Sequence, residues 1–528
     1  MLKLLCVSLF FVPKLLWAQQ ACENWQENKN YKTKLIIKRI DLQVGNIFDL
    51  KQKQQSKAFH KIANKLHVIT KQSIVKRELL FQEGDVLDVR LLAETERFLR
   101  AKPYIKDAHI EPTQVCGNEV TVAVVTRDNW TLTPGISYGR TGGVSKYTLE
   151  LQEKNLFGLG KSLEFKYKKG LDRTQKSIKY NDDNLFGTRN RLDAIYEDNS
   201  DGKLKFINYY HPFFSLDSDK SWGVRYFDNQ RITPLYDFGI ISDEIGQDRQ
   251  VFTLKYGRMF DRSSTTVQRY TLGFTSDKSR FYHSDAFPDT QIPSTRNYTY
   301  AWLGYEFFQE NYIKRTNFNR MGRIEDVSLG NHLFATVGLG NNSDFHYYIS
   351  YSRGLMQRQK DVILLQSFWR GIKQKSQFIN NTLNFNLKWH HWQSDNRSFF
   401  AALDVSKSHN LFAERRNYLG GDTGLRGYPL RYLNGDNRYL LTLEQRFFHH
   451  WYPLKTVKFA TAVFLDSGSA WNNGQDHSNL TNVGIGLRMV PTRTSSGQII
   501  HMDFAYPLNK RGGIVDSWQF QLRTKHTF

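Results

Sequence analysis

The feature of this sequence that most constrains its fold is an alternation of apolar and polar side chains from Trp130 to the C-terminus. In 163–168 (LEFKYK) apolar and charged residues alternate strictly, and 441–447 (LTLEQRF) sets Leu and Phe against Thr, Glu and Arg. Successive side chains of a β-strand point to opposite faces, so each segment predicts a strand with one apolar face. Gly, Asn and Asp separate the segments, which indicates antiparallel strands joined by turns.

The apolar faces of these strands are rich in aromatic residues and indicate contact with lipid. The chain has 37 Phe, 27 Tyr and 11 Trp, although its mean hydropathy is −0.55. A membrane-spanning strand exposes only alternate side chains to lipid, so its average hydropathy stays low. A soluble sandwich also alternates, but it keeps its aromatic residues in one core. The fold class predicted for 130–528 is a transmembrane antiparallel β-barrel of about 16 strands, at roughly 25 residues per strand with its connection.

The last segment shows the alternation most clearly. One predicted face carries Trp518, Phe520, Leu522 and Phe528, and the other carries Gln519, Gln521, Arg523 and Lys525. A four-residue word, NLFG, also occurs at 155–158 and again at 184–187. Each copy precedes a charged alternating segment, which predicts two similar turns, one hairpin apart.

The first residues have the build of a secretory signal. Lys3 precedes an apolar stretch that ends at Trp17, and Ala18 offers a small residue for cleavage. This stretch is too short to span a bilayer permanently, so 1–18 is interpreted as a signal peptide. Cleavage directly before Cys22 would instead make a lipoprotein, but the two glutamines at 19–20 do not suit such a signal.

Residues 33–128 predict a small α+β domain, with the order strand, helix, helix, strand, strand. The expected elements are a strand at 35–40, helices at 73–81 and 89–99, and strands at 104–112 and 119–126. Residues 49–70 do not fit this order and are interpreted as an inserted helix. In 89–99 an apolar stripe that includes Leu92 and Leu99 leaves Glu94 on the opposite, polar face.

Two cysteines remain after removal of the signal, Cys22 and Cys116. In an oxidising compartment they either form a bridge or stay as free thiols. A bridge would close a long loop and stabilise the domain by at most about 4–5 kcal/mol in the chain-entropy model.

The net charge of +22 does not indicate a nucleic-acid-binding protein. Lys and Arg are spread along the chain without a basic arm or a run of five or six. Anionic lipids and phosphate-rich glycolipids are a sufficient acidic partner for an exported barrel, and charge that serves solubility alone explains the value equally well.

Four segments in order resemble a known family. Residues 420–429 (GGDTGLRGYP) look like the signature loop of the BamA/TamA superfamily of outer-membrane assembly proteins, and 464–468 (FLDSG) resembles its later Phe-x-Asp-x-Gly strand. Residues 484–488 (GIGLR) and 503–508 (DFAYPL) resemble its closing strands, and Phe528 resembles its terminal aromatic signal. The N-terminal domain then looks like a single POTRA module in the periplasm. The family's principal assembler carries several such modules, and its two-partner secretion members carry a plug helix, for which we find no pattern in this sequence.

The resemblance implies where the functional residues lie. The loop that includes Tyr428 would fold into the barrel lumen, where Arg426 would pair with Asp466 on the wall. Gly424 and Gly427 would let the loop backbone turn and approach the wall closely. The alternative is an exposed surface loop. A weak lateral seam is expected between the first and last strands, at Leu132, Ile136, Tyr138, Phe520, Leu522 and Phe528.

Two patterns that suggest enzyme or metal chemistry have the wrong context. Residues 135–139 (GISYG) match a hydrolase nucleophile elbow, but a Gly-rich turn follows where that motif needs a helix. The pairs His390–His391 and His449–His450 cannot chelate one ion from a strand, because adjacent side chains point to opposite faces. We therefore expect no enzymatic activity, no cofactor and no metal.

By resemblance, the predicted function is to assist insertion or translocation of polypeptides at the outer membrane of a Gram-negative cell. The expected partners are outer-membrane lipids, unfolded client polypeptides, and periplasmic chaperones or an accessory protein. The alternative on the same scaffold is a passive or gated pore or a lipid-handling barrel, because a fold does not fix a function.

Overall fold

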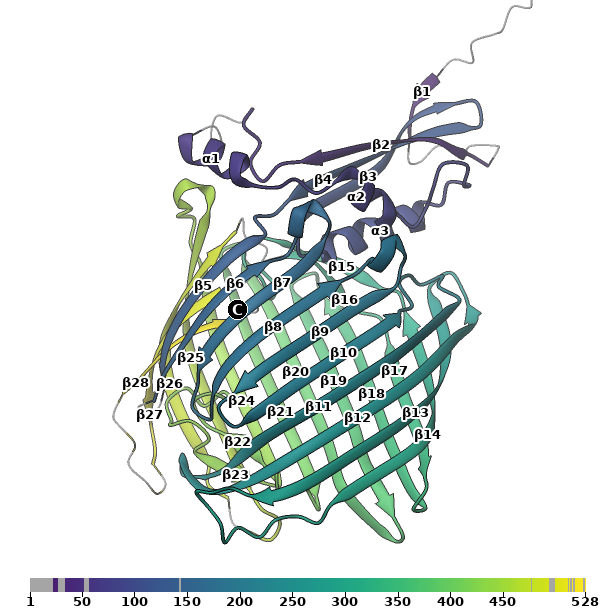
Figure 1. Ribbon diagram of the computed structural model, residues 1–528. Coiled ribbons are helices and arrows are strands. Elements are labelled where there is room, and N and C mark those ends of the chain that lie inside the picture. The colour runs from purple at the N-terminus through teal and green to yellow at the C-terminus, as the bar shows by residue number, and fades with distance from the viewer. Residues whose placement is uncertain are drawn as a thin grey trace, which may run out of the picture.

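The computed structural model describes residues 22–26, 34–51, 57–141, 144–475, 477–492, 499–510, 512, 515, 518–525 and 528. The predicted signal peptide, 1–18, lies outside these residues. In the described part, a small α+β domain sits on one end of a closed β-barrel (Figure 1). We call this end of the barrel the domain-side end and the opposite end the distal end.

The small domain has the predicted order of strand, helix, helix, strand and strand, with the inserted helix and with one further strand, β1, that was not predicted. Its elements are β1 (Cys22–Asn24), β2 (Ile36–Gly45), α1 (Ala58–Leu66), α2 (Gln72–Glu78), α3 (Val89–Ala101), β3 (Ile105–Cys116) and β4 (Glu119–Asp128). The sheet order is β1-β3-β4-β2, with β2 parallel to β4 and the other pairs antiparallel. The apolar sides of α2 and α3 pack on this sheet and form the core of the domain. Helix α1 is the insertion expected within 49–70.

Helix α3 differs from the expectation in what its polar face contacts. Leu92 and Leu99 are buried in the core as predicted, and the Asp88 side chain caps the helix by accepting from Arg90 N. Glu94 and Glu96 are buried as well. They are buried because this face lies against the barrel mouth rather than in solvent.

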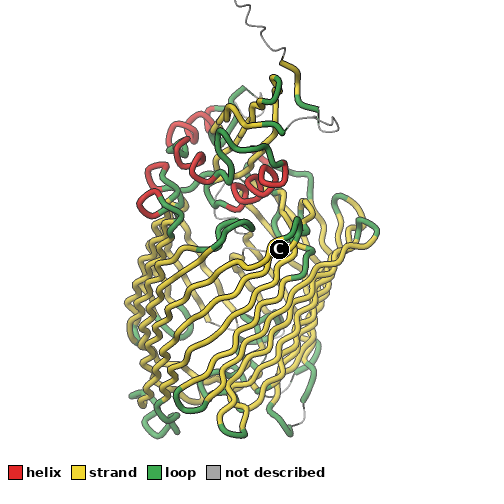
Figure 2. Tube along the Cα trace, turned by 90° about the vertical axis from the view of Figure 1, so that its right-hand side faces the viewer, coloured by secondary structure: helices red, strands yellow, loops and turns green. Residues whose placement is uncertain are grey.

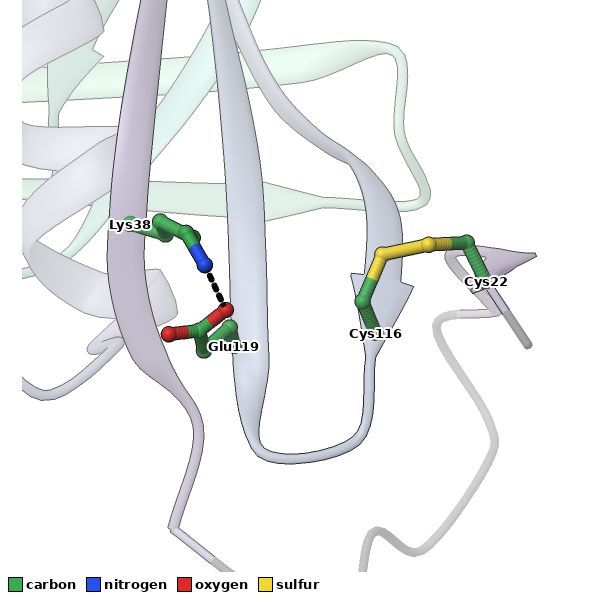
Figure 3. Close-up of a disulfide and its surroundings, with 4 residues drawn as sticks. All are labelled: Cys22, Lys38, Cys116 and Glu119. Atoms are coloured by element: carbon green, nitrogen blue, oxygen red, sulfur yellow. Dashed lines mark hydrogen bonds and ion pairs between the residues drawn. A yellow bond between two sulfur atoms is a disulfide. The ribbon is translucent and has the colours of Figure 1, made fainter. Parts of the chain in front are cut away.

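A disulfide joins Cys22 to Cys116 (Figure 3). It holds the short strand β1 antiparallel to the end of β3, with Asn24 opposite Gln114. On the other side of the sheet an ion pair between Lys38 and Glu119 connects β2 to β4. The disulfide therefore fixes the N-terminal end of the described chain to the outer edge of the sheet.

The barrel contains twenty strands in the described residues, rather than the expected sixteen or so. They are β5 (Leu132–Thr141), β6 (Val144–Glu153), β7 (Lys161–Lys169), β8 (Thr174–Asp182), β9 (Arg191–Asn199), β10 (Gly202–His211), β11 (Lys220–Asp237), β12 (Ile240–Arg262), β13 (Thr266–His283), β14 (Arg296–Gln309), β17 (His332–Gly340), β18 (Asp344–Gln357), β19 (Asp361–Gln374), β20 (Gln377–Ser394), β21 (Arg397–His409), β24 (Asn437–Phe448), β25 (Val457–Trp471), β26 (Leu480–Pro491), β27 (Ile499–Pro507) and β28 (Gln519–Lys525). The estimate was low because many connections are tight turns, such as the one between Asn199 and Gly202. The last strand, β28, neighbours the first, β5, and closes the barrel (Figure 1). Figure 2 shows the barrel and the small domain turned by 90°.

The alternation predicted from the sequence separates an apolar outer face from a polar lumen. Exposed outward-facing residues include Leu149, Phe165, Tyr196, Ile207, Tyr226, Phe252, Leu254, Leu272, Phe274, Leu303, Val337, Leu383, Val463, Ile485 and Phe504. We call this set the apolar belt. None of the helices in the described part of the chain is long and apolar enough to cross a membrane.

The repeated word NLFG forms two equivalent turns at the domain-side end. Phe157 and Phe186 have the same left-handed backbone, with φ of 55° and 54°. At the first turn, Gly158 O accepts from Lys71 N at 3.0 Å. At the second, Asn184 Nδ2 donates to the buried Glu78 at 2.6 Å. Both copies therefore hold the small domain on the barrel.

The connection between β14 and β17 forms a separate hairpin of β15 (Tyr312–Thr316) and β16 (Ile324–Ser328), which lies under the small domain (Figure 1). We call it the mouth hairpin. Arg100 of α3 binds Asp326 of this hairpin through two guanidinium nitrogens, at 2.8–3.1 Å. Lys314 of the hairpin binds Glu96 of α3 at 2.8 Å. The hairpin is thus fixed to the small domain by two ion pairs.

Candidate functional site: a loop inside the barrel

The residues between β21 and β24 enter the lumen from the distal end. Two short strands, β22 (Asn417–Leu419) and β23 (Leu433–Gly435), pair at the neck of this loop. Its tip, residues 420–431, carries the signature segment and packs through Leu425 and Tyr428, which are both fully buried. The loop is therefore inside the barrel rather than on its surface.

Arg426 is the centre of the contacts made by the loop. Its Nε and Nη2 donate to the two oxygens of Asp466 at 2.8 and 2.7 Å, and its Nη1 donates to Glu444 at 2.8 Å. The ring of Phe464 lies 3.4 Å from the guanidinium carbon. Only 5% of the Arg426 side chain is exposed, and Asp466 is fully buried. The contact implied by the resemblance is present, and Glu444 is a second carboxylate that the sequence did not single out.

Asp466 also binds groups on both neighbouring strands. It accepts from Thr442 Oγ1 of β24 at 3.1 Å and from Asn482 Nδ2 of β26 at 2.9 Å. The Asn482 side chain in turn accepts from the backbone N–H of Gly427 at 3.1 Å. Since a buried carboxylate needs several donors, this set fixes the position of the loop tip relative to three adjacent strands.

Gly424 and Gly427 are required by the close approach of the loop to the wall. Gly424 has a φ of +125°, and a Cβ there would lie 2.2 Å from Leu440. A Cβ on Gly427 would lie 2.5 Å from the side chain of Asn482. Larger residues at either position would move the loop away from the wall.

The loop also contacts the last strand of the barrel. Gln521 of β28 is fully buried, and its Nε2 donates to the backbone carbonyl of Arg426 at 2.8 Å. Tyr428 Oη lies 2.8 Å from Asn509 O, in the segment that leads to β28. Arg426 therefore binds the barrel wall through its side chain and the last strand, β28, through its backbone carbonyl.

A wider charged network surrounds this site in the lumen. Arg446 binds Glu444 at 2.8 Å, and Arg488 binds Asp503 at 2.6 Å. The guanidinium groups of both arginines lie over the ring of Phe528, at 4.4 and 5.5 Å. The sequence places Glu444 and Arg446 on a polar face, but only the strand register shows which of the inward charges meet.

Phe528 does not share the outer face of the last strand, contrary to the prediction. Strand β28 ends at Lys525, and Phe528 packs with Met321 and other inward residues. Its backbone N–H donates to Asn319 O of the mouth hairpin at 2.8 Å. Phe528 lies beyond the end of β28, and outside a strand the two-residue alternation no longer determines which way a side chain points.

The other residues predicted for the seam lie on β5 and β28, which are adjacent in the barrel. Ile136 is 83% exposed and Phe520 is 40% exposed, so both face outward, as does Leu132. Leu522 is half-buried, and the Tyr138 side chain lies outside the described residues. The elbow-like motif at 135–139 is within β5, and β6 follows it.

The tip of the mouth hairpin packs against the domain-side end of the lumen wall. Phe318 is buried and stacks on His390 at a centroid distance of 4.1 Å. His391 points the other way and binds Asp361 at 2.7 Å, so the adjacent histidines lie on opposite faces, as the alternation predicts. The hairpin and the small domain therefore both lie at the mouth of the barrel (Figure 1).

A buried pair, His67 and Asp128, lies where the small domain meets the barrel. The two side chains are 2% and 0% exposed, and His67 Nε2 is 3.7 Å from the carboxylate. Burial lowers the pKa of His67 to about 4 and raises the pKa of Asp128 to about 6, because the charged forms are poorly solvated there. Thr70 donates to Asp128 and accepts from Asn155 of the first NLFG turn at 2.8 Å.

No protein-family model matches the sequence, and no curated protein matches it. Among solved structures, BamA from Haemophilus ducreyi lacking POTRA domains 1–3 is similar at 14% identity and a TM-score of 0.39, over 92% of this chain and 84% of that chain. CdiB from Escherichia coli is similar at 11% identity and a TM-score of 0.47, over 93% of this chain and 76% of that chain. CdiB from Acinetobacter baumannii is similar at 16% identity and a TM-score of 0.43, over 93% and 74%. The chain is similar to BamA and CdiB along most of its length.

Proposed function

We propose that this chain is an outer-membrane protein that assists the insertion or translocation of polypeptides. One observation carries the proposal: Arg426 binds the lumen wall through its side chain and Gln521 of the closing strand through its carbonyl. A loop that joins these two parts couples the lumen to the seam between β28 and β5. The four motifs that resemble the BamA/TamA superfamily support the same function.

The apolar belt supports a position across the membrane. Its aliphatic and aromatic side chains are exposed around the outside of a closed barrel, where water would be unfavourable and lipid is favourable. We place the small domain, as a single POTRA-like module of 33–128, in the periplasm. The distal end, where the loop enters, then faces the cell exterior.

In the proposed mechanism, an unfolded client first adds a strand to the sheet of the small domain. The candidate site is the free edge of β2, on the side away from β4. After Ile37, the backbone groups of β2 on this edge bind side chains rather than another strand. Glu83 accepts from Ile40 N at 3.1 Å, and Gln72 donates to Leu42 O at 3.5 Å. A client strand can replace both bonds with backbone bonds. The client then passes the mouth hairpin, which moves aside, and reaches the seam.

The seam is tested by locking it with a disulfide. Ile136→Cys is combined with Phe520→Cys or Leu522→Cys, and the pair that bridges β5 to β28 under oxidation is used. The control is L272C/L303C, which bridges two neighbouring strands on the opposite side of the barrel from the seam, at exposed positions that face each other. We expect the seam lock to abolish client assembly until a reductant is added and the control lock to leave it intact. Full activity of the locked barrel would refute lateral opening.

The client is identified by comparing outer-membrane and secreted proteomes of cells with and without the protein. Loss of one or a few proteins with unchanged transcripts is the expected result. An unchanged proteome would refute a role in assembly. We propose no enzymatic activity and no cofactor, and we propose periplasmic chaperones or an accessory protein as further partners.

A second candidate function, a gated pore, is favoured by a polar cavity in the lumen. The cavity has a volume of about 860 Å³ and is lined by lysines and carboxylates of β6–β9, such as Lys166, Glu164 and Asp193. Steady single-channel conductance that persists after deletion of 33–127 would favour the pore. Conductance that is absent or unstable would favour the assembly function.

A further inference from the structure

A basic groove crosses the outer wall of the barrel near its distal end. It has a volume of about 420 Å³ and extends over β10 to β14. The cations that line it are Lys203, Lys205, Lys278 and Arg280, and the carboxylates are those of Asp228 and Asp248. The groove is separate from the lumen site and from the seam.

The strand register shows that these side chains point outward. Lys205 is two residues from the exposed Ile207, and Lys278 is four residues from the exposed Phe274, so each shares a face with a member of the apolar belt. Cross-strand pairs of Lys205 with Asp228 and of Gln250 with Lys278 join these positions on one face. The groove therefore lies directly beyond the belt, on the distal side.

The distance from the belt places the groove at the level of lipid headgroups. Two residues along a strand span about 7 Å, and four span about 13 Å. A strand tilt of about 40° reduces the height to roughly 5–10 Å. A lipid with its chains on Ile207 and Phe274 would thus present its headgroup to the groove.

The charges of the groove are not balanced within it. Asp248 lies 4.0 Å from Arg280, and Asp228 hydrogen-bonds to Tyr226. Lys205 and Lys278 are exposed and make no ion pair within the described residues. Four cations against two carboxylates leave an excess of positive charge, held on strands and therefore fixed in position.

We infer that this groove binds the phosphorylated headgroup of a glycolipid in the outer leaflet of the membrane. Five strands span about 19 Å, which is wider than a single phosphate and suits a headgroup with more than one. Lysine and arginine would bind the phosphates, and the side-chain amides of Gln230, Gln250 and Asn297 would bind sugar hydroxyls. The inference rests on the proposed outer-membrane position but not on the proposed client.

The test uses the purified full chain in a nonionic detergent with fluorescent bisphosphorylated lipid A as the probe. The groove variant is K205Q/K278Q. The matched control is K373Q/K407Q, which removes two exposed distal lysines that pair with Phe345 and Leu383 of the outer face elsewhere on the barrel. Unheated and heated gel mobility checks that each variant is folded.

We expect the groove variant to bind lipid A at least about tenfold more weakly than the wild type, and the control to bind within about twofold of it. Equal binding by both variants would overturn the site. Competition by phosphatidylglycerol as strong as that by unlabelled lipid A would overturn the glycolipid assignment. Because this assay contains no client, an unchanged proteome would refute the assembly function without affecting this result.

Discussion

Replacement of Arg426 by alanine should lower the free energy of unfolding of the barrel by about 3–5 kcal/mol, the usual cost of removing one partner from a buried ion pair. Arg426 makes three charge-assisted hydrogen bonds to Asp466 and Glu444. At about 1.5–3 kcal/mol each, the three bonds would sum to about 4.5–9 kcal/mol, most of which lies above this value. The net loss is smaller because Asp466 still accepts from Thr442 and Asn482 in the variant, and Glu444 still pairs with Arg446.

The assay is urea unfolding of the purified barrel in detergent, followed by tryptophan fluorescence, for R426A, D466N and the double variant. The double variant should lose less than the sum of the single variants, since each single change leaves a buried group unpaired. The control is Arg258→Ala, whose pair with Asp219 is 57% and 63% exposed and should contribute less than about 1 kcal/mol. Additive losses, or equal losses for R426A and R258A, would refute the argument.

Three further predictions concern the junction, the disulfide and the loop. In thermal unfolding of D128N, where only His67 of the pair still titrates, the stability of the small domain should fall as pH is lowered from 6.5 to about 4, because His67 takes up a proton in the unfolded state that it does not take up when buried. In H67Q, where only Asp128 still titrates, the stability should fall as pH is raised from 3.8 to about 6, because Asp128 keeps its proton in the native state and loses it in the unfolded state. Stability that changes in the same direction with pH in both variants would contradict one of these predictions. Cys116→Ser should destabilise the domain by at most about 4–5 kcal/mol, and an unchanged melting temperature would show that the bridge is not formed. Gly424→Ala should lower barrel stability by clearly more than the control Gly474→Ala, because both glycines have a positive φ but only a Cβ at Gly424 would meet a side chain. Equal losses in the two variants would argue against the close approach of the loop to the wall.

The main elements could be predicted from the sequence for physical reasons, whereas the central contact of the site followed only from the resemblance to a known family. The two-residue period determines which side chains face outward, so the barrel class and the inward position of Glu444 follow from local pattern. The pairing of Arg426 with Asp466 was predicted only from the family motifs, because the two residues are 40 positions apart and a local pattern does not show which distant segments meet. Which inward carboxylate completes the site depends on the register that sets Thr442 opposite Asp466.

The mouth hairpin could not be predicted from the alternation. Its strands are five residues long (YIKRT and IEDVS), and their apolar and charged residues do not alternate strictly, so no local pattern indicates where they lie. They leave the wall because tertiary contacts, such as that between Arg100 and Asp326, hold them under the small domain. The predicted number of strands, about 16, was too low for a related reason. The two-residue period identifies a strand but does not show how short the turn to the next strand is.

The mouth hairpin also imposes an order on the assembly of this protein. Its tip binds the N–H of Phe528, the last residue, and Met321 packs with residues of β25 to β27. These partners are brought together only when the C-terminal strands have formed. The tip of the hairpin therefore reaches its final position late, after the C-terminal part of the wall has formed, whereas the ion pairs between the hairpin and the small domain do not depend on those strands.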